Sequence, residues 1–271
     1  MLRFELSIII VSYNTKNKIA DCLESVLREI TDLKAEVIVI DNASTDNSGQ
    51  VIEKFKQVKF IQNKRNVGFA KACNQGATLA QGKYLFFLNP DTKVTTKSIT
   101  SLILEVESRK DAAVIAPKLV YPDGSDQNSV RNFPTIQRAI EEFFFFKKGV
   151  FEGFSPKVSK PQEVEAVVGA AMVIPKVIFK KLGGFDERYF MYYEDLDFCR
   201  KARKAGYKII FMPQAKVIHE VGISGKGDET KTLKYLKDSS RIYHGSLVSF
   251  LINLVLFWGQ KWQKLFANSQ V

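Results

Sequence analysis

The chain has 271 residues, of which 45% are hydrophobic and 25% charged, a balance typical of a globular protein with one large domain or two small ones. Its net charge of +11 favours anionic partners such as nucleotides, nucleic acid or an acidic membrane surface. No stretch reaches the roughly 18 apolar residues needed to cross a bilayer. The three cysteines form no CxxC or Cys/His cluster, which argues against structural zinc and predicts buried thiols in a reducing compartment: Cys22, Cys73 and Cys199.

The first half of the chain alternates strand-like and helix-like segments. A β-branched run at residues 6–11 predicts a strand that is covered on both faces, and Ser12 breaks this run. Further strands are predicted at 36–40, 58–61 and 83–88, and helices at about 16–28, 47–55 and 70–79. This alternation predicts an α/β fold built on a doubly wound, mostly parallel sheet with helices on both faces.

The second half of the chain is less regular. The predicted elements are a helix at about 96–109, strands at 113–116 and 164–174, helices at 176–181 and 194–205, and strands at 207–212 and 215–219. Residues 121–162 lose the alternation and hold Pro, Gly and a phenylalanine run at 143–146, so we interpret them as a variable, partly mobile insertion. The poor regularity of this insertion suits a region that adapts to a particular acceptor.

Polar side chains follow the predicted strands at their carboxyl ends, where open parallel sheets bind ligands. They are Ser12, Tyr13, Asn14, Asp41, Asn89 and Asp91. Neither a GxGxxG loop nor a P-loop follows the first strand, so side chains must hold a nucleotide. Tyr13 can stack on a base and Asp41 can accept a hydrogen bond from the base or the ribose. A packed core aromatic and a helix cap are the structural alternatives for these two residues.

Asp91 is a candidate ligand for Mg²⁺ or Mn²⁺, because a carboxylate is a hard ligand and both ions also take diphosphate oxygens. Asn89 can bind but is uncharged, which leaves one formal anionic ligand, and both residues could instead cap the next helix. His219 follows a late strand, where a metal or diphosphate contact and a structural role are equally expected.

A second acidic group lies about a hundred residues later, at Glu194, Asp195 and Asp197. One of these carboxylates could deprotonate an acceptor hydroxyl, although acidic residues in a first helical turn also complement the helix dipole. A metal-held diphosphate at one acidic site and a general base at the other point to sugar transfer from a nucleotide donor.

The motifs, taken as an ordered set, resemble the family 2 glycosyltransferases of the GT-A fold, and in particular their bacterial rhamnosyltransferase-like branch. The resemblance covers roughly residues 5–225. It rests on the segments 8–14 (IIIVSYN), 39–46 (VIDNASTD), 66–70 (NVGFA) with Asn74, 88–91 (LNPD), 183–190 (GGFDERYF) and 194–199 (EDLDFC).

The resemblance implies an inverting transfer from a nucleoside-diphosphate sugar of the dTDP or UDP type. It implies that Tyr13 and Asp41 contact the nucleoside, that Asp91 and His219 bind the metal, and that Asp195, beside Glu194, is the general base. The remaining donor-binding candidates are Ser12, Asn14, Asn66, Gly68, Asn74 and Asn89. Asn89 departs from the first aspartate of the usual DxD motif, which bears on the metal geometry more than on the reaction class.

Residues 1–225 are predicted to form the glycosyltransferase domain, with a nucleotide-sugar-binding half at about 1–120 and an acceptor and catalytic half at 121–225. Residues 226–271 form a basic, helical tail. On a helix over 246–266 one stripe is apolar: Leu247, Phe250, Leu251, Leu254, Val255, Trp258, Trp262, Leu265 and Phe266. This stripe predicts an interfacial membrane helix, and Lys231, Lys234, Lys237 and Arg241 could meet anionic lipids. Packing on the catalytic domain or on a second subunit is the alternative.

We therefore expect a cytoplasmic hexosyltransferase at the inner face of the cell membrane that builds a cell-surface polysaccharide or glycolipid. Its acceptor would be a glycan or a lipid-linked sugar, rhamnose is one candidate for the transferred sugar, and a homodimer remains open. The alternatives are a sugar nucleotidyltransferase, which would need a Gly-rich phosphate loop that this chain lacks, and a non-catalytic nucleotide-sugar-binding or scaffold protein. No nucleic-acid recognition motif is present.

Overall fold

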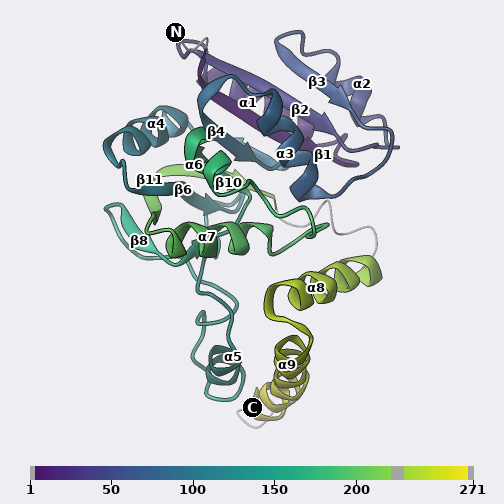
Figure 1. The fold of residues 1–271 in the computed structure, drawn as a ribbon, viewed down its shortest axis with the longest axis vertical. Coiled ribbons are helices and arrows are strands. Elements are labelled where there is room, and N and C mark those ends of the chain that lie inside the picture. Colours follow the sequence, from purple (N-terminus) through teal and green to yellow (C-terminus); the bar gives the residue numbers. More distant parts are fainter. Residues whose placement is uncertain (1–3, 221–228, 268–271) are drawn as a thin grey trace.

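The computed structural model describes residues 4–220 and 229–267. Figure 1 shows a twisted central sheet with helices on both faces and two C-terminal helices that extend away from it. Within the described residues the central sheet has nine strands, in the order β3-β2-β1-β4-β10-β6-β11-β5 with β8 paired to β11. Its strands are β1 (Phe4–Ser12), β2 (Ala35–Asp41), β3 (Val58–Gln62), β4 (Gly82–Leu88), β5 (Thr92–Val94), β6 (Ala112–Val120), β8 (Gln162–Val164), β10 (Ala171–Pro175) and β11 (Lys208–His219).

The first four strands are parallel, as the alternating pattern predicts. β1 lies between β2 and β4, and β2 continues the sheet to β3. The helices that return the chain are α1 (Ile19–Glu29), α2 (Ser48–Ile52) and α3 (Phe69–Leu79). β10 then pairs antiparallel with both β4 and β6, whereas β6 and β11 run parallel. The carboxyl ends of β1, β2 and β4 therefore share one edge of the sheet with the residues that enter β10.

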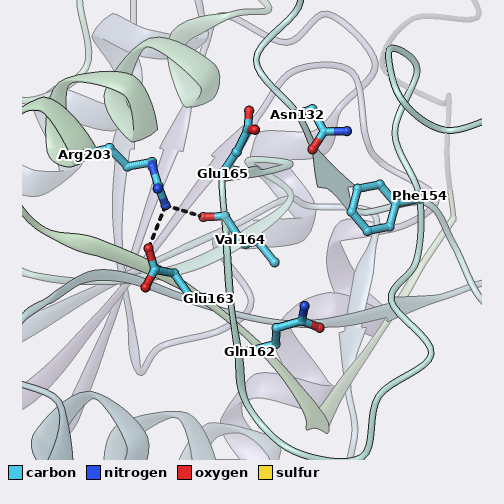
Figure 2. Close-up of a pocket in the computed structure, with 7 residues that line it drawn as sticks. All are labelled: Asn132, Phe154, Gln162, Glu163, Val164, Glu165 and Arg203. Atoms are coloured by element: carbon cyan, nitrogen blue, oxygen red, sulfur yellow. Dashed lines mark hydrogen bonds and ion pairs between the residues drawn. The ribbon is translucent and has the colours of Figure 1, made fainter. Parts of the chain in front are cut away.

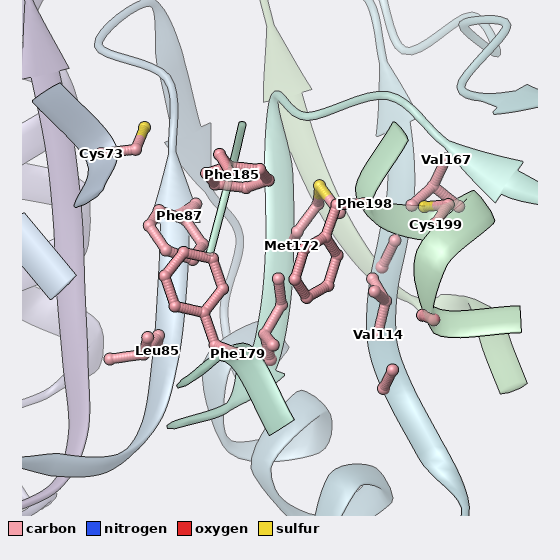
Figure 3. Close-up of a cluster of buried hydrophobic side chains, with 14 of the residues drawn as sticks. Cys73, Leu85, Phe87, Val114, Val167, Met172, Phe179, Phe185, Phe198 and Cys199 are labelled. Carbon is pink, nitrogen blue, oxygen red and sulfur yellow. The ribbon is translucent and has the colours of Figure 1, made fainter. Parts of the chain in front are cut away.

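Alternate residues of the buried strands feed two cores, one on each face of the sheet. Ile9 and Ile38 belong to one core, and Ile8 and Val37 belong to the other. The first core is rich in phenylalanine, and Figure 3 shows Phe87, Phe179, Phe185 and Phe198 packed together there. This core is covered by α3 and by α6 (Lys176–Lys181) and α7 (Glu194–Lys204), whereas α1 and α4 (Ser98–Ser108) cover the other face. All three cysteines are buried and free, as predicted.

The structure differs from the sequence-based prediction in three segments. Residues 207–212 and 215–219 form one strand, β11, because a register shift between Met212 and Lys216 carries it past Pro213. The insertion contains a regular helix, α5 (Ile136–Phe143), and a short strand, β7 (Val130–Arg131), which pairs with β9 (Ala166–Val167), a piece of the strand predicted at 164–174. The tail has two helices, α8 (Glu229–His244) and α9 (Ser246–Ala267), separated at Gly245 with a φ of 80°. The predicted domain boundary at 225 lies outside the described residues.

Candidate active site

The polar residues at the carboxyl ends of β1 and β2 lie side by side, because Ser12 pairs in register with Asp41. Tyr13 follows at the surface with 39% of its area exposed, which excludes the packed core aromatic and leaves a ring face free to stack. Asn14 adopts a positive φ of 53° and its side-chain oxygen accepts a hydrogen bond from the Thr45 amide at 2.8 Å. This bond ties the loop after β1 to the loop after β2.

Asp41 is fully buried and organises its own loop. Its carboxylate accepts hydrogen bonds from the Ser44 amide and from Gln62 Nε2, each at 3.2 Å, and from the Ser44 hydroxyl. The structure thus supports a loop-organising role of the kind that the capping alternative describes. A contact between Asp41 and the nucleoside stays a prediction.

Asn42, which follows Asp41 at the end of β2, joins this strand end to the third helix. Its side-chain nitrogen donates to Asn66 Oδ1 at 2.8 Å and to the Gly68 carbonyl at 3.2 Å, and its oxygen accepts from the Val67 amide at 3.0 Å. Gly68 has a φ of 89°, and a Cβ there would lie 2.7 Å from the Phe190 carbonyl oxygen. The predicted donor-binding residues Asn66 and Gly68 are therefore fixed beside the chain that leads to α7.

Asn74 lies on α3, and both ends of its side-chain amide form hydrogen bonds with a loop that is distant in sequence. Its nitrogen donates to the Phe185 carbonyl at 2.8 Å and its oxygen accepts from the Phe185 amide at 3.0 Å. In the structure this residue fastens α3 to the segment before α7. Its place among the donor-binding residues stays a prediction.

The structure brings Asp91 and His219 together across 128 residues of sequence. Asp91 Oδ1 lies 3.4 Å from His219 Nε2, and the two side chains are only 5% and 10% exposed. Gln127, a residue of the insertion, holds the other side of the imidazole: its Oε1 lies 2.7 Å from Nδ1 and its Nε2 donates to the His219 carbonyl at 3.4 Å. Because an amide oxygen only accepts, the Nδ1 atom carries the proton, and in the neutral ring the Nε2 lone pair faces Asp91.

This geometry fits a divalent cation. Asp91 Oδ1 is buried and has no hydrogen-bond partner, so a carboxylate oxygen and an imidazole nitrogen face each other with unused acceptor capacity. Within the described residues no three His, Cys, Asp or Glu side chains cluster as a metal site. Two protein ligands are nevertheless enough for Mg²⁺ or Mn²⁺ where substrate phosphates supply the rest. Asn89 contributes differently, because its backbone amide donates to the Ala170 carbonyl at 2.9 Å.

The second acidic group lies in the first turn of α7, and its three carboxyl groups have different surroundings. Asp197 is bound by Arg200 at 2.8 Å and Lys201 at 2.7 Å, so its charge is already balanced. Glu194 is buried, its Oε2 has no hydrogen-bond partner, and burial together with the charge of Asp195 holds its pKa well above the usual value. Burial therefore disfavours the charged form of Glu194.

Asp195 is partly exposed and its carboxylate is held at both oxygens. Oδ2 accepts from the Gly169 amide at 2.8 Å and Oδ1 accepts from the Leu196 amide at 2.7 Å. Burial raises the pKa of Asp195, and the Gly169 amide, the charge of Arg131 and the Leu196 amide oppose that rise. The result is an oriented carboxyl group with a pKa above its usual value, which is what a general base needs.

Gly169 and Ala170 bridge the two acidic sites. The Gly169 amide binds Asp195, and the carbonyl of the next residue, Ala170, binds the amide of Asn89 in the segment that leads to Asp91. A Cβ at Gly169 would lie 3.2 Å from Asp195 Cβ, so glycine permits this close approach. Sequence reasoning missed Gln127, Gly169 and Arg131, because only the tertiary structure shows what they touch.

An open pocket of about 260 Å³ lies beside the insertion, away from both acidic sites. Figure 2 shows Arg203 between Glu163 and the Val164 carbonyl, with Glu165, Asn132, Phe154 and Gln162 completing the wall. Its lining includes none of the residues predicted from the motifs. Arg203 and Glu163 satisfy each other's charge at 2.9 Å.

The mixed sheet, the strand-end polar residues and the paired acidic sites define a glycosyltransferase of the GT-A fold class. Solved structures share the fold: GalNAc-T7 with UDP, GalNAc and Mn²⁺ has a TM-score of 0.66 at 18% identity, over 88% of this chain and 47% of that one. S. aureus TarS 1-349 has a TM-score of 0.59 at 16% identity, over 93% and 69%.

Residues 7–183 match the model of glycosyl transferase family 2, and the chain belongs to that family. Residues 151–221 also match the model described as the N-terminal domain of galactosyltransferase. Among curated relatives, the N-acetylglucosaminyl-diphospho-decaprenol L-rhamnosyltransferase of Mycobacterium tuberculosis is 27% identical over 88% of this chain and 83% of its own. Rhamnosyltransferase WbbL of Escherichia coli K12 is 28% identical over 78% and 82%. The predicted rhamnosyltransferase-like branch is thereby confirmed.

Proposed function

We propose that this glycosyltransferase moves a sugar, with rhamnose as the first candidate, from a dTDP- or UDP-linked donor to a hydroxyl of a glycan or lipid-linked acceptor, with inversion at the anomeric carbon. The relatives support the sugar and the acceptor class, because the mycobacterial protein is named for transfer of L-rhamnose to a diphospho-decaprenol sugar. Among the solved structures of the same fold, GalNAc-T7 is in complex with UDP, GalNAc and Mn²⁺, and S. aureus TarS 1-349 is in complex with UDP-GlcNAc.

The observation that carries the proposal is the Gly169–Ala170 bridge. It binds Asp195 through one peptide group and the Asn89 backbone through the next, so the candidate base and the Asn-Pro-Asp segment are held by adjacent residues. Transfer needs an acceptor hydroxyl, an anomeric carbon and a leaving diphosphate close together in that order. A base and a diphosphate site fixed to one short segment meet this requirement.

We assign the proton transfer to Asp195. Its ionised carboxylate takes the hydroxyl proton of the acceptor as that oxygen attacks the anomeric carbon, and the bond to the diphosphate breaks. The Gly169 and Leu196 amides hold the carboxylate in place and favour its ionised form. The raised pKa of the neighbouring Glu194, caused by burial and by the charge of Asp195, disfavours a second negative charge beside the base.

On the donor side, the exposed ring of Tyr13 is proposed to stack on the base, with Asp41, Asn14 and Ser12 shaping the nucleoside pocket. Asp91 and His219 would hold Mg²⁺ or Mn²⁺, which would balance the charge of the leaving diphosphate. Gln127 keeps the His219 ring oriented toward Asp91.

We place the enzyme at the inner face of the cell membrane, attached peripherally by its C-terminal helix. A lipid-linked acceptor would require this position, and many apolar side chains of α9 are exposed. Within the described residues no helix is both long and apolar enough to cross a membrane.

The proposal is tested by a screen of dTDP- and UDP-sugars for donor hydrolysis and for transfer, with and without Mn²⁺. Asp195→Asn should abolish transfer and spare donor binding measured by calorimetry, whereas Asp123→Asn, in an exposed loop, should leave both unchanged. Near-normal turnover of the Asp195 variant would overturn the assignment of the base.

A further inference from the structure

Helix α9 turns Ser249, Ile252 and Gly259 inward and most of its large apolar side chains outward. Ser249 is buried, with its hydroxyl 2.8 Å from that of Ser240 on α8, and Gly259 is buried against α5. The exposed large apolar side chains of the helix are Leu247, Phe250, Leu251, Leu254, Phe257, Trp258, Trp262 and Leu265. Most of the expected apolar stripe therefore does not pack on the rest of the protein, although the Trp262 ring centroid lies 6.2 Å from that of Phe144. The side chain of Phe266 lies outside the described residues.

The end of α5 continues this exposed face. A Cβ at Gly259 would lie 2.4 Å from Phe143 Cβ, so the two helices approach as closely as a glycine allows. Gln263 Nε2 donates to the Glu142 carbonyl at 3.1 Å. Directly after α5, Phe145 and Phe146 are 68% and 48% exposed. In Figure 1, α5 and α9 lie together at the end of the molecule farthest from β1–β3.

Most charges around this face are positive, and Glu141 at the end of α5 is an exception whose carboxylate lies 3.3 Å from Lys147 Nζ. Residues 239–271 contain no Asp or Glu, and Lys261 and Lys264 lie on α9. Lys261 Nζ lies 4.2 Å from the ring centroid of Phe257 and 5.1 Å from that of Trp258. Lys147 and Lys148 follow the two exposed phenylalanines. Tryptophan and phenylalanine interleaved with lysine match the boundary between acyl chains and anionic headgroups.

We propose that α9 and the end of α5, residues 144–148, form one composite surface that binds an anionic lipid bilayer. This goes beyond attachment by the tail alone, because the catalytic half contributes Phe145, Phe146 and two lysines. A bilayer suits the composite surface better than a second copy of the chain does, since two-fold pairing would bring together two surfaces of the same, mostly positive charge.

The composite surface is also connected to the segment that precedes the candidate base. The ring of Tyr235 on α8 stacks on Phe190 with centroids 4.6 Å apart, and Ser239 Oγ donates to the Met191 carbonyl at 2.8 Å. α8 in turn packs on α9. A bilayer bound at the composite surface would therefore have a fixed position relative to α7, which suits an acceptor that stays in the membrane.

The chain supplies its own probe, because its two tryptophans are Trp258 and Trp262. Binding to vesicles of phosphatidylglycerol mixed with phosphatidylcholine should shift the tryptophan emission to the blue, and brominated lipid in the vesicles should quench that emission. Pure phosphatidylcholine should give much weaker binding. An unchanged spectrum with anionic vesicles would overturn the proposal. A second result would also overturn it: without vesicles, the tryptophan emission shifts to the blue as the protein concentration rises, and ultracentrifugation shows a dimer. That result would assign the surface to a second copy of the chain.

Matched variants separate charge from apolar contact. Lys261→Glu with Lys264→Glu should weaken partitioning into anionic vesicles by at least about 30-fold, since each lysine near such a surface contributes about 1 kcal/mol, or about fivefold. Lys54→Glu with Lys56→Glu, exposed near α2, changes the net charge equally and should have a much smaller effect.

Phe145→Ser should weaken binding roughly tenfold, and Leu104→Ser, equally exposed on α4, should not. Equal effects in the test and control variants would contradict a defined surface. Donor hydrolysis in the same samples should be unchanged by all four variants, so a failure of lipid binding is distinguishable from a failure of the proposed enzyme activity.

Discussion

Gly169→Ala is expected to move the acid limb of the pH–rate profile to higher pH while donor binding persists. A Cβ at this position would lie 3.2 Å from Asp195 Cβ and 3.4 Å from Oδ2, so the carboxyl group must move by a few tenths of an ångström. That movement lengthens the 2.8 Å hydrogen bond from the Gly169 amide to Oδ2. A hydrogen bond to a charged group contributes about 1.5–3 kcal/mol, so losing half of it costs about 1 kcal/mol.

The direction of the pKa change depends on which protonation state of Asp195 the Gly169 amide favours. Its N–H stabilises the ionised carboxylate, so a weaker bond raises the pKa, and about 1 kcal/mol corresponds to somewhat less than one pKa unit. The ionised form is the base, and activity is therefore present above the pKa and lost as the pH falls through it. On the acid limb kcat/KM should fall about three- to tenfold, with little change on the plateau.

The assay is the pH dependence of kcat/KM with saturating metal, with donor binding measured by calorimetry at each pH. Ser108→Ala, at the exposed end of α4, should leave the profile unchanged. A folded Gly169 variant whose acid limb coincides with that of the parent enzyme would refute the link between this amide and the ionisation of Asp195.

Three further predictions concern the metal side, a glycine and a buried histidine. Gln127→Leu should weaken Mn²⁺ binding about 10- to 100-fold in spin-resonance titrations, because nothing then orients His219. Gly68→Ala should lower the free energy of unfolding by about 2–3 kcal/mol in calorimetry, since its φ of 89° and the Phe190 carbonyl both exclude a Cβ. His244 has its pKa lowered from 6.5 to about 4 by burial, so it should contribute stability that is lost as the pH falls from about 6.5 toward 4. His244→Phe should remove about 1 kcal/mol of that dependence in thermal unfolding, allowing for its partial exposure.

Each of these predictions has its own contrary outcome. Gln137→Leu, on the exposed face of α5, is the control for the metal titration, and equal Mn²⁺ affinity in both variants would remove Gln127 from the site. An unchanged melting temperature would contradict the strain argument at Gly68. A stability curve of the His244 variant that is parallel to that of the parent between pH 4 and 6.5 would show that this histidine titrates alike in both states.

Much of the first half of the fold could be predicted from the sequence because its strands are buried on both faces. Residues 8–11 and 84–88 are continuous apolar runs, and the spacing of apolar residues changes to a helical period where the helices begin. α5 was missed because Phe143–Phe146 adds apolar residues on every side and obscures the helical period. β11 was divided in two because Pro213 resembles a strand end, and only the pairing with β6 shows that the strand continues.

The candidate site could be predicted where a residue follows a strand directly, and not where its role depends on a distant partner. Asp91 and His219 were both predicted as metal ligands, and the structure places them 3.4 Å apart. Gln127 lies in the irregular insertion, 92 residues from the imidazole that it holds, and no local pattern signals that contact. Gly169 is one glycine among 16, and its importance depends on the position of Asp195.

The tail shows a limit of amphipathic patterns. The sequence defines two faces of the helix over 246–266, but a hydrophobic stripe indicates that burial is needed without saying what provides it. On α9, Gly259 allows Phe143 to approach where a larger side chain would collide with it. The face of α9 that carries Gly259 is therefore the one that contacts α5. Because that face is used, the apolar one is left outward beside Phe145 and the lysines. Gly259→Leu should therefore separate α9 from α5 and weaken vesicle binding even though it adds apolar surface, a result that simple hydrophobicity does not predict.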